Sequence, residues 1–240
     1  KEYLFDTGHG ETLFFNAEKL AIDLKNIDTI FLSHGHDDHT GGLKRLLQAN
    51  HKIRVFAHSD LFLPKHKKID NNFYFNGVKI KKSQITNFQA AEKNKKAAEG
   101  IYSITEIKTS PKLYKDFSEK RCIIKNNKKT VDLFNDENTI FIESEKGIVI
   151  LLGCSHKGVV NIIDEIRSKL GDKKIKAILG GMHLKTATKK EVTEIIDYFK
   201  LINFDLLVPI HCTGRVAALM FKEAFGEKVK LASVGDKFKF

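Results

Sequence analysis

The sequence lacks any apolar stretch close to the roughly 18–20 residues that a membrane span needs. The richest run, GIVILLG at residues 147–153, is far too short. Its first residues, KEYLFDTG, show no charged leader followed by an apolar region, so nothing indicates secretion. Three cysteines in 240 residues do not make a disulfide framework. We therefore expect a cytoplasmic protein with no membrane association.

Positive charge is concentrated in one part of the chain. The net charge is +11, and residues 61–130 alone hold 17 basic against six acidic residues. The remaining 24 basic and 24 acidic residues cancel. One interpretation is a set of solvated loops; the other is a basic cap that raises the local concentration of an anionic substrate. We expect a single domain, 1–240, with a basic insertion or cap at roughly 61–130.

An apolar fraction of 42% and 18 phenylalanines indicate a globular chain with a substantial core. Strand and helix patterns alternate, most regularly in the second half, which predicts an α/β fold. Thr40 is a possible N-cap for the helix at 40–49. The predicted strands are 2–5, 28–33, 52–58, a hairpin within 138–153, 174–181 and 204–210; the predicted helices are 16–24, 40–49, 158–171, 189–202 and 215–225.

Four side chains that can bind metal ions are crowded into IFLSHGHDDHTGG, residues 30–42. His34 and His36 are two apart on a tight turn and can share one ion, while Asp38 and His39 can hold a second. A hydrolytic metal site needs such imidazole and carboxylate ligands and an open position for water. The pattern therefore predicts a dinuclear metal site.

Three further histidines follow predicted strands in glycine-rich loops: His156 in LLGCSHKG, His183 in ILGGMHL and His211 in VPIHCTG. Open α/β sheets place their sites at the carboxyl ends of strands, where such side chains can converge. We expect these three loops to contribute to the same site.

The H-x-H-x-D-H spacing after an apolar strand, with DTG before it and TGG after it, resembles the metallo-β-lactamase superfamily. Together with LLGCSHKGVVNII, ILGGMHL, VPIHCTG and the ending SVGDKFKF, it resembles one branch. That branch is usually labelled dihydropteroate-synthase-like, or 7,8-dihydropterin-6-methyl-4-(ribofuranosyl)aminobenzene-phosphate synthase-like. The resemblance implies a four-layer αββα sandwich with the metal site along one edge.

The resemblance also implies roles for individual residues. Asp6 of DTG would support the histidine loop through hydrogen bonds. His183 would be an added ligand, an acid for the leaving group, or a contact for a substrate phosphate. The implied metal ligands are His34, His36 and His156 for the first ion, and Asp38, His39 and His211 for the second.

One dipeptide departs from the superfamily pattern. In the superfamily a bridging aspartate commonly stands in a Gly-Asp dipeptide after a strand, and here the dipeptide is Gly153–Cys154. Three alternatives are open: His156 supplies the lost ligand, Cys154 coordinates, or one metal binds weakly. Cys154 is otherwise interpreted as a small buried residue.

These observations predict a metal-dependent hydrolase acting on a small anionic substrate, a phosphate ester or phosphodiester. Asp38 would orient the attacking water and His183 would assist at the leaving group. Two divalent ions are expected; zinc suits the ligands best, and manganese or iron is feasible. The alternatives are a nuclease acting on RNA or DNA, or a metal-binding module without catalysis. The oligomeric state is left open.

Overall fold

The computed structural model describes residues 1–110, 120–171 and 173–240. The described residues form two compact units. The first comprises Lys1–Glu92 and the described residues of Asp116–Asn138. The second comprises the described residues of Lys93–Lys115 and Thr139–Phe240.

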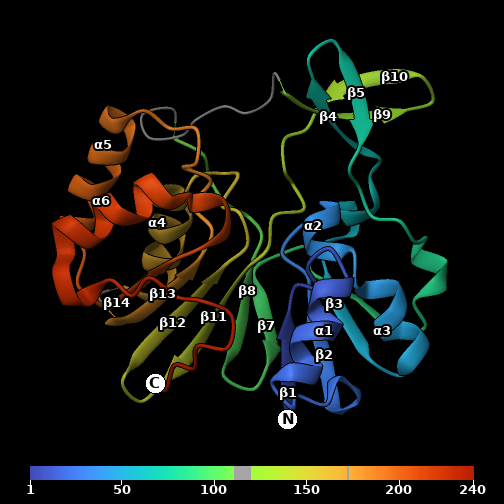
Figure 1. Ribbon diagram of the computed structural model, residues 1–240, viewed down its shortest axis with the longest axis horizontal. Helices are drawn as coiled ribbons and strands as arrows, with labels where there is room; N and C mark the ends of the chain where they lie inside the picture. The colour runs from blue at the N-terminus through green and yellow to red at the C-terminus, as the bar shows by residue number, and fades with distance from the viewer. Residues whose placement is uncertain (111–119, 172) are drawn as a thin grey trace. The chain divides into compact units, whose positions relative to one another are not determined.

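The first unit is built on a parallel sheet with strand order β1-β2-β3-β6. Its first three strands are labelled in Figure 1. Apolar side chains of β2 and β3 are buried, as is typical of parallel strands covered by other elements. They pack against apolar residues of the helices, such as Leu43 and Leu46. The elements are β1 (Glu2–Phe5), α1 (Glu11–Lys19), β2 (Ile27–Phe31), α2 (Asp37–Thr40), α3 (Leu43–Ala49), β3 (Arg54–Ala57) and β6 (Phe88–Ala90).

The same unit contains a small antiparallel sheet with strand order β10-β9-β4-β5. Its strands are β4 (Lys65–Ile69), β5 (Asn72–Phe75), β9 (Arg121–Lys125) and β10 (Lys128–Val131). Asn126 and Asn127 join β9 to β10, and both have positive φ, as a two-residue hairpin turn of the mirror-image type requires. Asparagine tolerates this conformation better than most residues. Much of the basic segment therefore folds as paired strands.

The second unit is built on a six-stranded sheet with strand order β14-β13-β12-β11-β8-β7. The predicted hairpin is confirmed, because β11 pairs antiparallel with β12. β12, β13 and β14 run parallel, so their carboxyl ends meet at one edge. The elements are β7 (Lys95–Ala98), β8 (Ile101–Ile104), β11 (Thr139–Ser144), β12 (Gly147–Leu152), α4 (Val159–Leu170), β13 (Ile175–Gly180), α5 (Lys189–Lys200), β14 (Phe204–Pro209) and α6 (Arg215–Phe225).

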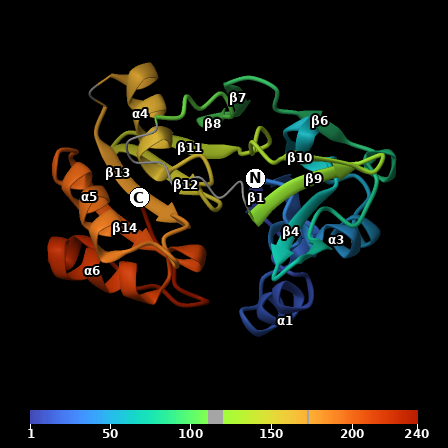
Figure 2. The same cartoon turned by 90° about the horizontal axis from the view of Figure 1, so that it is seen from above.

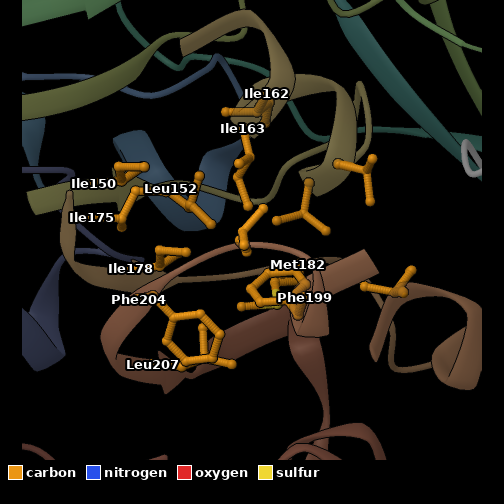
Figure 3. Close-up of a cluster of buried hydrophobic side chains, with 14 of the residues drawn as sticks. Ile150, Leu152, Ile162, Ile163, Ile175, Ile178, Met182, Phe199, Phe204 and Leu207 are labelled. Carbon is orange, nitrogen blue, oxygen red and sulfur yellow. The ribbon is translucent and has the colours of Figure 1, made fainter. Parts of the chain in front are cut away.

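Helices α4, α5 and α6 pack on the same side of this sheet (Figure 2). Ile162 and Ile163 of α4 and Phe199 of α5 are fully buried among strand residues such as Ile150 and Ile178 (Figure 3). α5 begins at a capping box, in which Thr188 and Glu191 satisfy each other's backbone N–H groups. This core fixes the strand ends that carry His156, His183 and His211.

Several sequence expectations need correction in detail. Thr40 does not cap α3; it ends α2 and donates its hydroxyl to the carbonyl of His36. α1 begins at Glu11, five residues before the predicted start, because apolar residues 13 and 14 also join the core. The basic segment contributes β6 to the first sheet, four strands to the small sheet, and β7 and β8 to the second unit. The single-domain assignment stays a prediction.

Short 3-10 turns occupy Leu24–Asn26, Ser59–Phe62, Lys82–Gln84, His211–Thr213 and Gly226–Lys228. Within the described ranges, none of the helices has the length and apolar content that a bilayer crossing requires.

Candidate metal centre

Asp6 connects the ends of two neighbouring parallel strands in the first unit. It follows β1 and accepts hydrogen bonds from the Ser33 backbone N–H and hydroxyl, which follow β2, both at 2.7 Å. Asp6 has a φ of 61°, a left-handed conformation that non-glycine residues adopt only where the surroundings hold it. The carboxylate is thereby fixed at the base of the histidine loop.

His39 is oriented by the same carboxylate. Its Nδ1 lies 2.6 Å from Asp6 Oδ2, the kind of contact by which a carboxylate orients an imidazole that binds a metal ion. Burial alone would lower the pKa of His39, but the carboxylates of Asp6, Asp38 and Glu137 together outweigh burial and raise this pKa above 6.5. Asp38 Oδ2 lies 3.7 Å from His39 Nε2, so a carboxylate and an imidazole nitrogen face the same space.

His34 and His36 form a second convergent pair in the same loop. His34 Nε2 and His36 Nδ1 are 2.9 Å apart, and the two rings meet edge to face. Ser33 Oγ lies 2.9 Å from His34 Nδ1, on the opposite side of that ring. Burial, aided by the positive charges of Arg121 and Lys65, holds the pKa of His36 well below 6.5. His36 is therefore neutral at physiological pH, the form that binds metal ions.

The loop between these histidines has no room for a side chain. A Cβ on Gly35 would lie 2.2 Å from the carbonyl oxygen of Leu61. The Gly35 N–H donates to Asp136 Oδ2 at 2.7 Å, and the Asn138 N–H donates to the Ser33 carbonyl at 2.7 Å. A distant segment thus holds the backbone that carries the two ligands.

In the second unit, three strand ends carry non-glycine residues in the left-handed region. Ser155 after β12, His183 after β13 and His211 after β14 have φ values of 58°, 53° and 53°. Such strain gathers at functional sites, where packing keeps side chains in a required direction. The rings of His156 and His183 lie 4.5 Å apart, and Ser155 Oγ donates to the Gly181 carbonyl at 2.7 Å.

Cys154, His211 and Cys212 form another group of donors within this unit. One ligand atom from each lies within 4.8 Å of the other two. Cys212 Sγ contacts the Cys154 carbonyl oxygen at 3.6 Å, and a Cβ on Gly181 would lie 2.6 Å from this sulfur. Two sulfurs and one nitrogen are ligands that zinc accepts, so coordination by Cys154 is chemically feasible.

The predicted residues therefore fall into two sets. The first unit brings together Asp6, His34, His36, Asp38 and His39, and the second brings His156 beside His183. His211 lies beside the two cysteines. Nitrogen and carboxylate donors of this kind suit zinc, manganese or iron, so the residues present fit the predicted metals.

Sequence reasoning missed the side chains that hold the histidine loop: Ser33, Lys65, Asp132, Asp136 and Asn138. Lys65 belongs to the run PKHKK, for which solvation was one interpretation, yet it is 1% exposed. The acidic residues of DLFNDEN, directly after the basic segment, were the only sequence feature that could have suggested a charged partner for Lys65.

Comparisons with known proteins show which family and fold this chain resembles. Residues 1–108 match the family described as the metallo-beta-lactamase superfamily. A solved structure described as a metal-dependent hydrolase of the beta-lactamase superfamily is similar to this chain with a TM-score of 0.85 and 28% identity. The match covers 100% of this chain and 89% of that one, and it confirms the predicted α/β fold of the metallo-β-lactamase type.

Two curated proteins of Methanocaldococcus jannaschii are also similar. One is named 7,8-dihydropterin-6-methyl-4-(beta-D-ribofuranosyl)-aminobenzene-5'-phosphate synthase; it is 32% identical over 252 residues, covering 100% of this chain and 85% of its own. The other is an uncharacterized protein, 34% identical over 220 residues, covering 89% of this chain and 80% of its own. Because the first match covers the whole of this chain and residues 1–108 match the family model, the chain belongs to the metallo-β-lactamase superfamily.

Proposed function

We propose that this protein is a metal-dependent hydrolase whose substrate is a small anion, a phosphate ester or phosphodiester. The observation that carries the proposal is the pair of convergent donor groups in one loop. His34 Nε2 faces His36 Nδ1, and His39 Nε2 faces the Asp38 carboxylate while Asp6 holds the other side of that ring. A carboxylate on the ring nitrogen opposite the ligating one, as Asp6 is on His39, is typical of histidines that bind metal ions.

The proposed ligand sets follow the superfamily resemblance. His156 would complete the first set and His211 the second, each from a strand end that family members use for ligands. The strained backbone at Ser155 and His211 supports this assignment, because packing has fixed these loops in an unfavourable conformation. Cys154 is the alternative metal ligand in this proposal, since it lies with His211 and Cys212 in one group of donors.

The chain's own residues prepare this site in three ways. Asp6 fixes the tautomer of His39, so that Nε2 presents its lone pair. The lowered pKa of His36 keeps a proton from competing at that ring. Asp38 would orient the attacking water, and His183 would give a proton to the leaving group or hold a phosphate oxygen. When bound, two divalent ions lower the pKa of water and stabilise charge on the attacked group.

The positive charge of the small sheet supports the proposal of an anionic substrate. Its strands and turns, residues 65–75 and 121–131, hold seven basic residues and one acidic residue. Lys68, Lys125, Lys128 and Lys129 among them are exposed. An excess of positive charge raises the local concentration of anions and their association rate.

A second candidate function comes from the curated relative. Its name denotes a synthase, and the product in that name contains a dihydropterin and a ribofuranosyl 5'-phosphate. A phosphate-bearing substrate is consistent with both candidates.

We propose a cytoplasmic location as well, since none of the three cysteines is in a disulfide.

A metal-by-substrate screen tests these proposals. Phosphomonoesters, phosphodiesters, lactones, thioesters, RNA and single-stranded DNA are each assayed with zinc, manganese and iron. Joining of a dihydropterin that carries a leaving group on its 6-methyl carbon to an aminobenzene ribofuranosyl 5'-phosphate, with release of that group and a proton, is assayed in parallel. We expect metal-dependent hydrolysis of a phosphate ester or phosphodiester. Hydrolysis of RNA or DNA would favour the nuclease, and product from the joining assay alone would favour the synthase.

Two histidine variants complete the screen. His39→Ala should abolish turnover while the protein stays folded. His51→Ala is the matched control, because His51 lies in an exposed turn and should leave turnover unchanged. Unaltered activity in His39→Ala would overturn the assignment of the site.

A further inference from the structure

A buried ion cluster lies next to the histidine loop in the first unit. Lys65, the first residue of β4, donates from Nζ to Asp132 Oδ2 and to Asp136 Oδ1, both at 2.8 Å. All three side chains are at most 2% exposed. Burial alone would lower the pKa of Lys65, but the two carboxylates outweigh it and raise this pKa. Removing three charges from water costs free energy that their mutual attraction offsets only in part, so the stability of the fold does not by itself explain the cluster.

Asp136 uses its second oxygen for a different contact. Oδ2 accepts the N–H of Gly35 at 2.7 Å, and Gly35 is the residue between His34 and His36. Asn138 donates to the carbonyls of Leu32 and Ser33, immediately before these ligands. The segment 132–138 therefore holds the loop at several consecutive peptides.

Phe134 in the same segment packs its ring 6.0 Å from the ring of His36. It is fully buried with a φ of 51°, a strained conformation for an aromatic residue. The segment is thus held in an unfavourable backbone shape that brings Asp136 and Phe134 to the loop.

We propose that Asp136 is a positioning residue that sets the direction of the His34–His36 pair toward its metal ion, and that Lys65 holds Asp136 in place. The proposal rests on the proposed function, because it takes this pair as metal ligands. A hydrogen bond to the peptide between two ligands fixes the orientation of both. Partners that orient ligands in this way change metal affinity by about 10–100-fold when removed.

Asp132 provides a matched control within the same cluster. Like Asp136, it accepts from Lys65 Nζ at 2.8 Å, and it also accepts one backbone N–H, that of Phe134 at 2.9 Å. Its burial is equivalent. Replacement by asparagine removes the same charge in both cases, but only Asp136 contacts a residue between the two ligands.

The test compares wild type, Asp132→Asn and Asp136→Asn. Zinc affinity is measured by competition with a chelator, the visible spectrum is recorded with Co²⁺, and unfolding in urea is followed without metal. We expect similar losses of stability in both variants. Only Asp136→Asn should lose about 10–100-fold in zinc affinity and change the Co²⁺ spectrum.

Asp136→Glu is the second variant, in case the asparagine replacement does not fold. It keeps the charge facing Lys65 but displaces the oxygen that accepts from Gly35, so weaker zinc binding is again expected. Equal affinity in wild type and in a folded Asp136 variant would overturn the positioning role. Absence of zinc binding in wild type would instead overturn the proposed function.

Discussion

Lys65→Met isolates the energetic role of the buried cluster. The substitution removes the cation and keeps a long, flexible apolar side chain of similar shape. Asp132 and Asp136 are then left as neighbouring buried carboxylates without the Nζ group that lies 2.8 Å from each in the wild type. The substitution also removes the ammonium group that lies 5.5 Å from the centroid of the Phe134 ring.

The expected loss in the free energy of unfolding is about 3–5 kcal/mol, because one partner of a buried ion pair is removed and the other charges stay uncompensated. This is a large part of the roughly 5–15 kcal/mol that stabilises a typical protein.

The assay is urea unfolding of the metal-free protein at neutral pH. Lys68→Met is the matched control, since Lys68 lies on the same strand and is exposed. It should change stability by less than about 0.5 kcal/mol. A loss below about 1 kcal/mol in Lys65→Met, or an equal loss in Lys68→Met, would refute the reasoning.

Four further predictions concern other parts of the chain. Gly35→Ala should destabilise the protein by about 1–3 kcal/mol and weaken zinc binding, because the new methyl group meets the Leu61 carbonyl; chelator competition showing wild-type affinity would contradict this. Zinc affinity should fall as the pH drops through the raised pKa of His39, where a proton competes at Nε2, and in Asp6→Asn this fall should move to lower pH; an unchanged pH profile would count against the role of Asp6. In the metal-free protein, the His39–Asp6 pair should stabilise most below pH 6.5 and lose its contribution as the pH rises through the folded pKa, as urea unfolding at several pH values can show. Thr188→Ala should cost about 1 kcal/mol through loss of the α5 cap, and thermal unfolding unchanged from wild type would contradict it.

The parts that were predictable from sequence depend on local patterns. The spacing of His34, His36, Asp38 and His39 follows from adjacent positions in one loop, so their convergence needs no knowledge of distant contacts. The hairpin within 138–153 was predictable because apolar strands flank a turn signal. Strand–helix alternation likewise predicted the strand ends that carry His156, His183 and His211.

The parts that were not predictable depend on contacts between distant segments. Lys65 meets carboxylates 67 and 71 positions further along the chain, and nothing in PKHKK distinguishes it from its exposed neighbours. Thr40 looked like a helix cap because hydroxyl residues often occupy that position. The chain instead forms α2 over Asp37–Thr40, where Gly41 must lie against the backbone of His9.

The most direct test of the central claim is the metal content of the purified protein after loading with zinc. We predict about two divalent ions per chain, the number that a two-metal hydrolytic site holds. His36→Ala and His211→Ala should each lower this number, and His51→Ala should not. Absence of bound metal in the wild-type protein under metal-replete conditions would contradict the account.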